Sequence, residues 1–161
     1  MIFPLRQHPT ADYHEAPRSF GSPRPGRKHA ACDLYAPKGT EILAVADGVI
    51  THVSTTYYHP SPEADWVGAV EVWHGMSVGK IRYAEIDHLA AGLQAGSPIK
   101  AGQVIAYVGQ VAGMTNAMLH FEKYSGNLNG PLTVIPNKPF ERRKDLQDPT
   151  GFLDSCTLLQ S

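Results

Sequence analysis

The chain has 161 residues and a mass of 17.5 kDa, which is the size of one domain with its own hydrophobic core. Its formal net charge at pH 7 is -1 and its basic residues form no dominant stripe, so we expect no nucleic-acid partner. No stretch of about 18 or more residues is continuously apolar, so we expect no membrane span.

Residues 1–28 contain five prolines and two glycines and show no helical or strand periodicity. We expect them to form an extended N-terminal arm that either packs over the domain or frays. The arm lacks the continuous apolar core of a secretory signal peptide. Near its end, Arg24, Arg27 and Lys28 form a basic cluster. We expect this cluster in a solvated loop; the alternative is that it attracts carboxylates of a peptide.

Short strand-like runs, separated by Gly, Pro and Asp, continue from residue 31 to residue 124. This spacing favours a single antiparallel all-β domain over residues 29–125. Beyond the first strand, we expect strands at residues 41–45, 48–54, 69–74, 81–86, 103–108 and 119–124. Ala46-Asp47-Gly48 predicts a hairpin between the first two of these strands. Residues 55–67 should be a loop, and residues 89–93 a single helical turn.

Residues 126–161 are expected to form a loop-rich C-terminal tail that packs on the same domain. Asp148 before Pro149 is typical of a helix N-cap followed by proline at the first helical position, which predicts a short helix near Thr150–Asp154. We expect simple packing of the tail over the core. The alternative is that the tail walls one side of a groove.

His29 and Asp33 lie four residues apart at the start of a strand, and His120 lies inside a distant strand. Residues i and i+4 project from the same face of a strand, whereas Cys32 points to the other face, where we expect a buried thiol. Cys32 and Cys156 allow one disulfide or none. We predict that His29, Asp33 and His120 converge on one divalent metal, with zinc as the best candidate. Three protein ligands with one open position are typical of a catalytic zinc.

Several motifs between residues 26 and 125 carry a family resemblance. They are His29–Asp33, Ala36–Ile50, Trp73–Gly75, Tyr83–Ala84, Ile99–Gly109 and Leu119–Glu122. Together they resemble the lysostaphin-type (LytM-like) zinc metallopeptidases, which cut peptidoglycan peptides. The resemblance implies a β-sheet or β-sandwich domain of lysostaphin type, zinc as cofactor, and His29, Asp33 and His120 as its ligands.

The chain departs from the family pattern at two catalytic positions. The family carries His-x-His at the last metal site, and here the first of these residues is Met118. The family's Tyr-x-His-Leu motif places Glu85 at the histidine position, or else matches His88 after a three-residue insertion. We therefore expect Glu85 to be the general base, with His88 as the alternative. A thioether cannot donate a hydrogen bond to an oxyanion, and loss of one such donor costs about 10²–10³ in rate.

The implied function is zinc-dependent hydrolysis of peptide bonds in peptidoglycan stem peptides or cross-links. One alternative is a catalytically inactive relative that binds cell-wall peptide or glycan. Another is a biotinyl- or lipoyl-type carrier, because Gly96–Ile105 also resembles the half-repeat of those domains. With no signal peptide, we expect export by a dedicated machine or a phage route and action in the periplasm or cell wall of a target cell. An antibacterial effector or phage-associated lysin of this kind would have a cognate inhibitor or immunity protein as partner.

Overall fold

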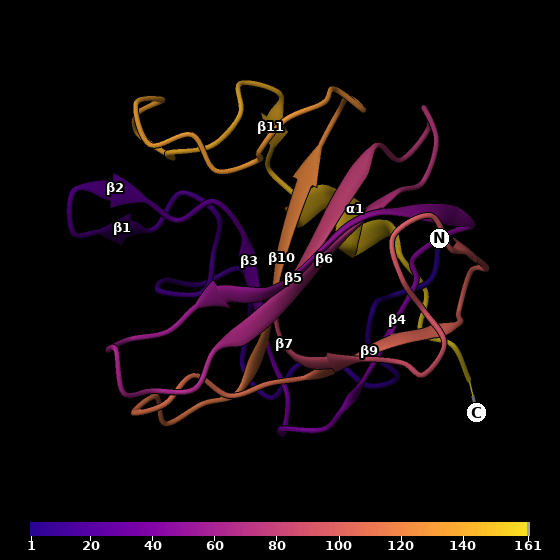
Figure 1. The fold of residues 1–161 in the computed structure, drawn as a ribbon, viewed down its shortest axis with the longest axis horizontal. Helices are drawn as coiled ribbons and strands as arrows, with labels where there is room; N and C mark the ends of the chain where they lie inside the picture. The colour runs from indigo at the N-terminus through magenta and orange to yellow at the C-terminus, as the bar shows by residue number, and fades with distance from the viewer. Residues whose placement is uncertain (161) are drawn as a thin grey trace.

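The computed structural model describes residues 1–160, which form a twisted β-sheet with one short helix (Figure 1). Nine strands belong to the main sheet. They are β3 (Cys32–Tyr35), β4 (Glu41–Leu43), β5 (Gly48–Tyr58), β6 (Val67–Trp73), β7 (Lys80–Leu89), β8 (Pro98–Ile99), β9 (Val104–Val108), β10 (Met118–Tyr124) and β11 (Leu146–Gln147). A separate hairpin joins β1 (Pro23–Arg24) to β2 (Arg27–Lys28), and α1 spans Thr150–Ser155.

All pairings between these strands are antiparallel, which confirms the predicted all-β class. The main path of the sheet runs β11-β10-β7-β6-β5-β8; β3 also pairs with β10, and β9 pairs with both β4 and β7. β6 is buried along nearly its whole length, as in a strand covered on both faces, and is apolar except for Glu71, which pairs with Arg82 of β7. β5 is largely exposed and correspondingly more polar.

The predicted hairpin around residues 46–48 is wrong. β4 pairs with β9, whereas β5 pairs with β6 and β8. The turn at residues 46–48 is bound to the segment before β9. The Asp47 carboxylate accepts a hydrogen bond from the Ala101 N–H at 2.9 Å, and it lies 3.2 Å from the Lys100 ammonium. The predicted loop at residues 55–67 is also too long, since β5 continues to Tyr58, which pairs with Val67. Residues 90–93 form a turn and not a helix.

Both terminal segments pack on the domain. In the N-terminal arm, Phe3, Leu5 and Tyr13 are buried, so the arm does not fray. The helix α1 closes the far side of the core, where the Phe152 ring stacks on Phe121 at 6.2 Å between centroids. Its position confirms the predicted C-terminal helix, but the predicted cap is wrong by one residue: Pro149 is the N-cap and Thr150 the first helical residue. The Asp148 carboxylate still accepts a hydrogen bond from the Thr150 N–H at 2.9 Å. Within the part of the chain that the structure describes, no helix has the length and apolar character needed to cross a membrane.

Candidate metal centre

The pairing of β3 with β10 sets Asp33 directly opposite His120. Side chains of directly opposed residues share one face of the sheet, with Cβ atoms about 4.5–5.5 Å apart. We had expected His29 at the start of the strand, but it lies before β3. Its backbone N–H donates to the Ser22 carbonyl at 2.9 Å. The imidazole of His29 still lies beside Asp33. One carboxylate oxygen, Asp33 Oδ1, lies 3.0 Å from His29 Nε2 and 3.0 Å from His120 Nδ1.

The outer nitrogens of the two imidazoles indicate where their protons lie. His29 Nδ1 lies 3.0 Å from the Ser19 carbonyl oxygen, and His120 Nε2 lies 2.9 Å from Glu122 Oε1. Both partners are acceptors, so we assign the N–H groups to these outer nitrogens. With a cation in the centre, neutral imidazoles would direct the lone pairs of their inner nitrogens toward it; without one, a proton must lie between these nitrogens and Asp33 Oδ1. Second partners of this kind are typical of metal-binding histidines.

The three inner atoms fit a metal ion. Atoms of His29, Asp33 and His120 that could act as ligands all lie within 4.8 Å of one another, and all three residues are buried. Three electron pairs that converge in a buried space repel one another unless a proton or a cation lies between them. One carboxylate and two imidazoles form a donor set that suits zinc. The residues that we predicted as ligands are therefore brought together in a geometry that a divalent cation would complete.

The pKa values of Asp33 and His120 are shifted in the directions that favour positive charge at the centre. Burial alone would raise the pKa of Asp33, but hydrogen bonds from His120 and His29 lower it to about 2. Burial alone would lower the pKa of His120. Its neighbours Tyr57, Asp33 and Glu122 outweigh burial and raise that pKa well above its ordinary value. The site thus holds an ionised carboxylate at neutral pH and stabilises a cation beside it.

A buried ion-pair network contacts His120 through Nε2, the ring nitrogen that faces away from Asp33. Glu122 is fully buried, and its carboxylate accepts hydrogen bonds from Arg142 Nε at 2.9 Å, Arg82 Nη1 at 3.3 Å and the Tyr124 hydroxyl at 2.5 Å. These cations and the His120 bond hold the pKa of Glu122 well below its usual range despite burial. Glu122 follows His120 by two residues in β10, so the two side chains lie on the same face of the strand. Nothing in the sequence indicated that Arg82 and Arg142 complete the network.

We expect the Glu122→Gln substitution to destabilise the fold by about 3–5 kcal/mol, because it leaves the buried Arg142 guanidinium without its counter-charge and leaves Arg82 paired with Glu71 alone. It should also weaken metal binding by about 10–100-fold, since His120 loses its orienting partner. Urea unfolding and competitive zinc titration measure the two effects. The exposed Glu63→Gln variant serves as the control. Equal unfolding midpoints for the two variants would contradict a structural role for the network.

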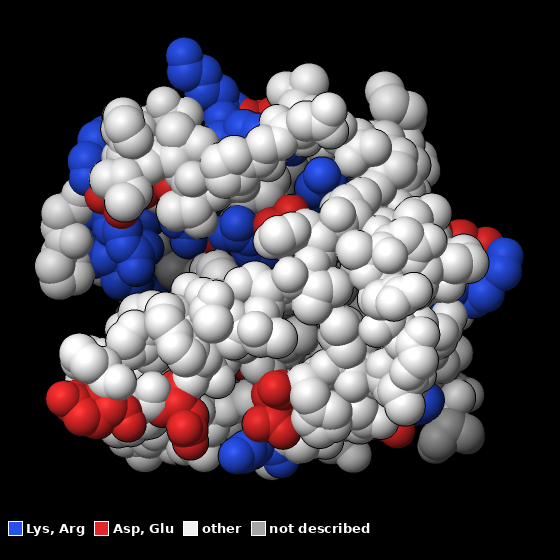
Figure 2. Space-filling view, viewed as in Figure 1, with Lys and Arg blue, Asp and Glu red and all other residues white. Residues whose placement is uncertain are grey.

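The centre opens into a cavity of about 580 Å³. Its wall combines basic, aromatic and apolar side chains. The basic lining residues are Arg24, Arg27 and Arg142, the aromatic ones include Tyr57 and Tyr58, and the apolar ones include Val111, Met114 and Met118. In Figure 2, Lys and Arg side chains gather beside a hollow on the side of β1 and β2, and Asp and Glu side chains lie on the opposite lower rim.

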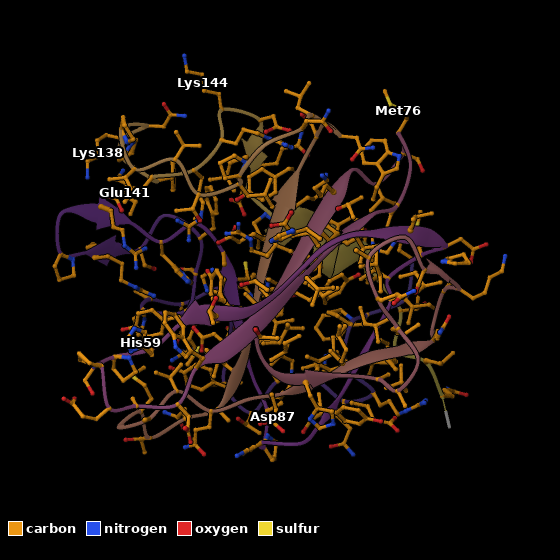
Figure 3. The ribbon with its side chains drawn as sticks, in the orientation of Figure 1. His59, Met76, Asp87, Lys138, Glu141 and Lys144 are labelled. Carbon is orange, nitrogen blue, oxygen red and sulfur yellow. The ribbon has the colours of Figure 1, made fainter. Side chains whose placement is uncertain are left out.

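The cavity corrects two expectations about the ends of the chain. Arg24 and Arg27 line it, so these two arginines do not lie in a freely solvated loop. Thr133 and Arg142 from the C-terminal tail line it as well. The tail therefore walls one side of the site in addition to packing on the core. Figure 3 shows Lys138 and Glu141 of the tail beside the β1–β2 hairpin.

Glu85 also lines the cavity. It marks the point where β7 changes partner, from β10 at Ala84 to β9 at Ile86. Glu85 has a φ of 62°, which is uncommon for a residue with a side chain, and such strain clusters at functional sites. Gly109 permits this bend, because a Cβ there would lie 2.8 Å from the Glu85 carbonyl oxygen. Burial raises the pKa of Glu85 to about 7 against the opposing charge of His120.

His88 is not brought to the centre. It is exposed, its Nδ1 lies 2.8 Å from Asp87 Oδ2, and its ring stacks on Tyr107 at 4.7 Å. Figure 3 places Asp87 at the lower edge of the molecule. The buried thioether of Met118 lines the cavity, as the resemblance to the family's His-x-His motif implied. Tyr83 is fully buried in the core.

The two cysteines are not part of the centre and are both free thiols. Cys32 is fully buried, as predicted, and its Sγ lies 3.4 Å from the Thr150 hydroxyl. Burial raises the pKa of the Cys32 thiol to about 11. Cys32 is therefore a core residue despite its place next to a candidate ligand.

Comparison with solved structures defines the class of fold. The chain superposes on the catalytic domain of the antimicrobial peptidase lysostaphin from Staphylococcus simulans with a TM-score of 0.62 at 21% identity, over 85% of this chain and 90% of that one. It superposes on a zinc-containing peptidase from Vibrio cholerae with a TM-score of 0.52 at 24% identity, over 76% of this chain and 36% of that one. These likenesses confirm the predicted lysostaphin-type fold.

Sequence comparison identifies the family. The model of peptidase family M23 matches residues 27–130, which is more than half of the chain. The DD-carboxypeptidase/endopeptidase Mpg of Neisseria meningitidis and Neisseria gonorrhoeae is 34% identical over 114 residues. That match covers 70% of this chain but only 24% of Mpg. The chain belongs to peptidase family M23.

Proposed function

We propose that this protein is a zinc-dependent peptidase that hydrolyses peptide bonds in the stem peptides or cross-links of peptidoglycan. The observation that carries the proposal is the convergence of His29 Nε2, Asp33 Oδ1 and His120 Nδ1 at the base of an open cavity. Membership of family M23 and the likeness to Mpg support peptidoglycan as the substrate. Such a substrate would place the site of action in the periplasm or cell wall.

The proposed roles follow from the chemistry of the side chains. His29, Asp33 and His120 would hold zinc, which supplies Lewis acidity toward a carbonyl and toward water. Glu85 would take a proton from the attacking water and return it to the leaving amine. A carboxylate with a pKa of about 7 suits both directions of proton transfer near neutral pH. We propose Glu85 as the base in preference to His88, because Glu85 lines the cavity and His88 does not.

The rate should fall as the pH is lowered, because the base must be ionised to accept a proton. The pKa of Glu85 sets the midpoint of this acidic limb, and burial raises that pKa to about 7 before any metal is bound. A bound divalent cation favours the ionised carboxylate and moves the midpoint below that value. The measurement is kcat/KM on a peptide substrate between pH 4 and pH 9, with zinc occupancy checked at each pH. A rate that rises toward acid would contradict the assignment.

The direct test is digestion of purified peptidoglycan by the zinc-loaded protein, followed by mass spectrometry of the released muropeptides. We expect new free amino groups and fragments that differ from the undigested wall by hydrolysis of one type of peptide bond. Addition of a chelator should stop their release.

A second function is favoured by Met118, which lines the cavity where the family places a catalytic histidine. A thioether donates no hydrogen bond, so the protein could bind cell-wall peptide through the metal centre without cleaving it. Bound zinc and bound peptide, with no fragments released after prolonged digestion, would favour this binding function over hydrolysis.

A further inference from the structure

We propose that Arg24 and Arg27 form a carboxylate-binding subsite in the cavity, so that the preferred ligand is a peptide with a free carboxylate group close to the metal centre. The subsite deepens the proposed function, because it specifies which peptides the site takes. Its binding role can be tested without turnover.

The first observation is an unsatisfied guanidinium nitrogen. Arg27 lines the cavity, and its Nη1 is buried with no hydrogen-bond partner within residues 1–160. Buried polar groups almost always have a partner, and each exception calls for a reason such as a missing ion. A rotation of the Arg27 guanidinium that turns Nη1 toward the cavity would let an oxygen of a bound ligand supply that partner.

The second observation is a pair of like charges. In the β1–β2 hairpin, Arg24 is the direct cross-strand partner of Arg27. Side chains of such partners lie on the same face, and like charges placed directly opposite each other destabilise a hairpin. Both arginines line the cavity. An anion between them would convert this repulsion into attraction.

The hairpin is fixed in place next to the metal centre. Its ends are joined to the segment of His29, because the His29 N–H donates to the Ser22 carbonyl and the Gly21 N–H donates to the His29 carbonyl. From the tail, the Lys28 N–H donates to the Pro139 carbonyl at 2.7 Å. The backbone that carries both arginines is therefore fixed beside the cavity, so ligand binding needs to order only their side chains.

Arg24 connects the subsite to a metal ligand. Its Nη2 donates to the Pro17 carbonyl at 2.7 Å and lies 3.5 Å from Asp33 Oδ2. A group bound by Arg24 would therefore lie close to the centre formed by Asp33 and the two histidines. This places the carboxylate near the bond that reacts.

The other cations of this region already have counter-charges. Arg142 Nε bonds to Glu122 at 2.9 Å, and Lys138 pairs with Glu141. The charge of Arg27 helps to lower the pKa of Glu141, although no hydrogen bond joins the two residues. Arg24 faces only the Asp33 carboxylate, at 3.5 Å, and Arg27 forms no ion pair with the described residues. The capacity to bind an additional anion therefore lies chiefly with Arg27, with Arg24 beside it.

The chemistry of the cavity points to a carboxylate on a small peptide. A guanidinium group offers a planar fork of donors that matches the two oxygens of a carboxylate. The apolar side chains of Val111, Met114 and Met118 line the same cavity and suit short aliphatic side chains. Stem peptides of peptidoglycan, which combine alanine residues with free carboxylates, have this character.

The test measures binding to the zinc-loaded Glu85→Gln protein, which should bind peptide without consuming it. Three forms of one stem peptide are titrated by calorimetry: the free acid, the form with a C-terminal amide, and the form with its internal carboxylate amidated. We expect the free acid to bind about 10–100-fold more tightly than one of the amides. The amide that loses affinity identifies whether the terminal or the internal carboxylate is recognised.

The Arg27→Gln substitution, added to the same protein, should remove this difference. Lys28→Gln is the matched control, because it removes one positive charge from the same hairpin at an exposed position that does not line the cavity. Near-UV circular dichroism and zinc content verify that each variant is folded and loaded. Equal affinity for all three peptides, no measurable binding of any of them, or a preference that survives Arg27→Gln would overturn the subsite.

The results of these binding experiments distinguish a failure of the subsite from a failure of the proposed peptidase activity. Cleavage of peptidoglycan together with equal binding of acid and amides would refute the subsite and leave the peptidase intact. A clear preference for the free acid, together with no cleavage by the unmodified protein, would refute the peptidase and leave the subsite intact.

Discussion

Replacing His120 by alanine is expected to abolish both stoichiometric zinc binding and peptide hydrolysis. The substitution removes one of three proposed ligands, and His29 and Asp33 alone cannot retain zinc in a catalytic geometry. It also removes the partner of the buried Glu122 carboxylate, which keeps its bonds to Arg82 and Arg142. We expect hydrolysis to fall by at least about 10³-fold, because water activation and carbonyl polarisation both depend on the metal.

Zinc content by mass spectrometry and hydrolysis of a stem peptide measure the two losses. His52→Ala is the matched control, since His52 is exposed and lies outside the lining of the cavity. It should retain one zinc and full activity. Retention of one zinc by the His120→Ala protein would show that the ion binds elsewhere.

Replacing Glu85 by glutamine is expected to lower kcat by about 10²–10⁴-fold while zinc binding persists. The amide keeps the size of the side chain but cannot accept a proton. Glu85 is not among the three proposed ligands, so the metal centre should remain assembled. Steady-state kinetics on a stem peptide, with zinc content measured in parallel, separates loss of the base from loss of the metal.

The companion variant His88→Ala distinguishes the two candidates for the base. The structure places His88 against Asp87 and Tyr107 on the surface, so we expect its removal to leave kcat unchanged. The opposite pattern, with Glu85→Gln active and His88→Ala inactive, would make His88 the base and would require β7 to rearrange in the active protein.

The metal ligands could be predicted because their residue types and motif context carry chemical information. The sequence pattern alone did not fix the strand register that sets Asp33 opposite His120. Local spacing also led to a wrong detail, since His29 lies before the strand and contacts Asp33 from the segment that precedes it. The family resemblance supplied the connection between the two distant motifs.

The basic wall of the cavity could be predicted only in part, because it depends on contacts between segments far apart in the chain. The sequence offered Arg24 and Arg27 near the site as an alternative to a solvated loop, and it gave no sign of Arg142. Arg24 and Arg27 come from the N-terminal arm and Arg142 from the C-terminal tail. Each lies in a segment that is rich in loops and has no periodicity to indicate a buried face. The hairpin predicted at residues 46–48 failed for a related reason: its turn residues were suitable, but the pairing of β4 with β9 prevailed.

The most direct measurement is an anomalous diffraction map of crystals of the zinc-loaded protein, recorded at the zinc absorption edge. We predict a single strong peak about 2.0–2.2 Å from His29 Nε2, His120 Nδ1 and a carboxylate oxygen of Asp33. A fully loaded crystal with no peak among these atoms, or with its zinc bound by other residues, would contradict the metal centre on which the proposed peptidase depends.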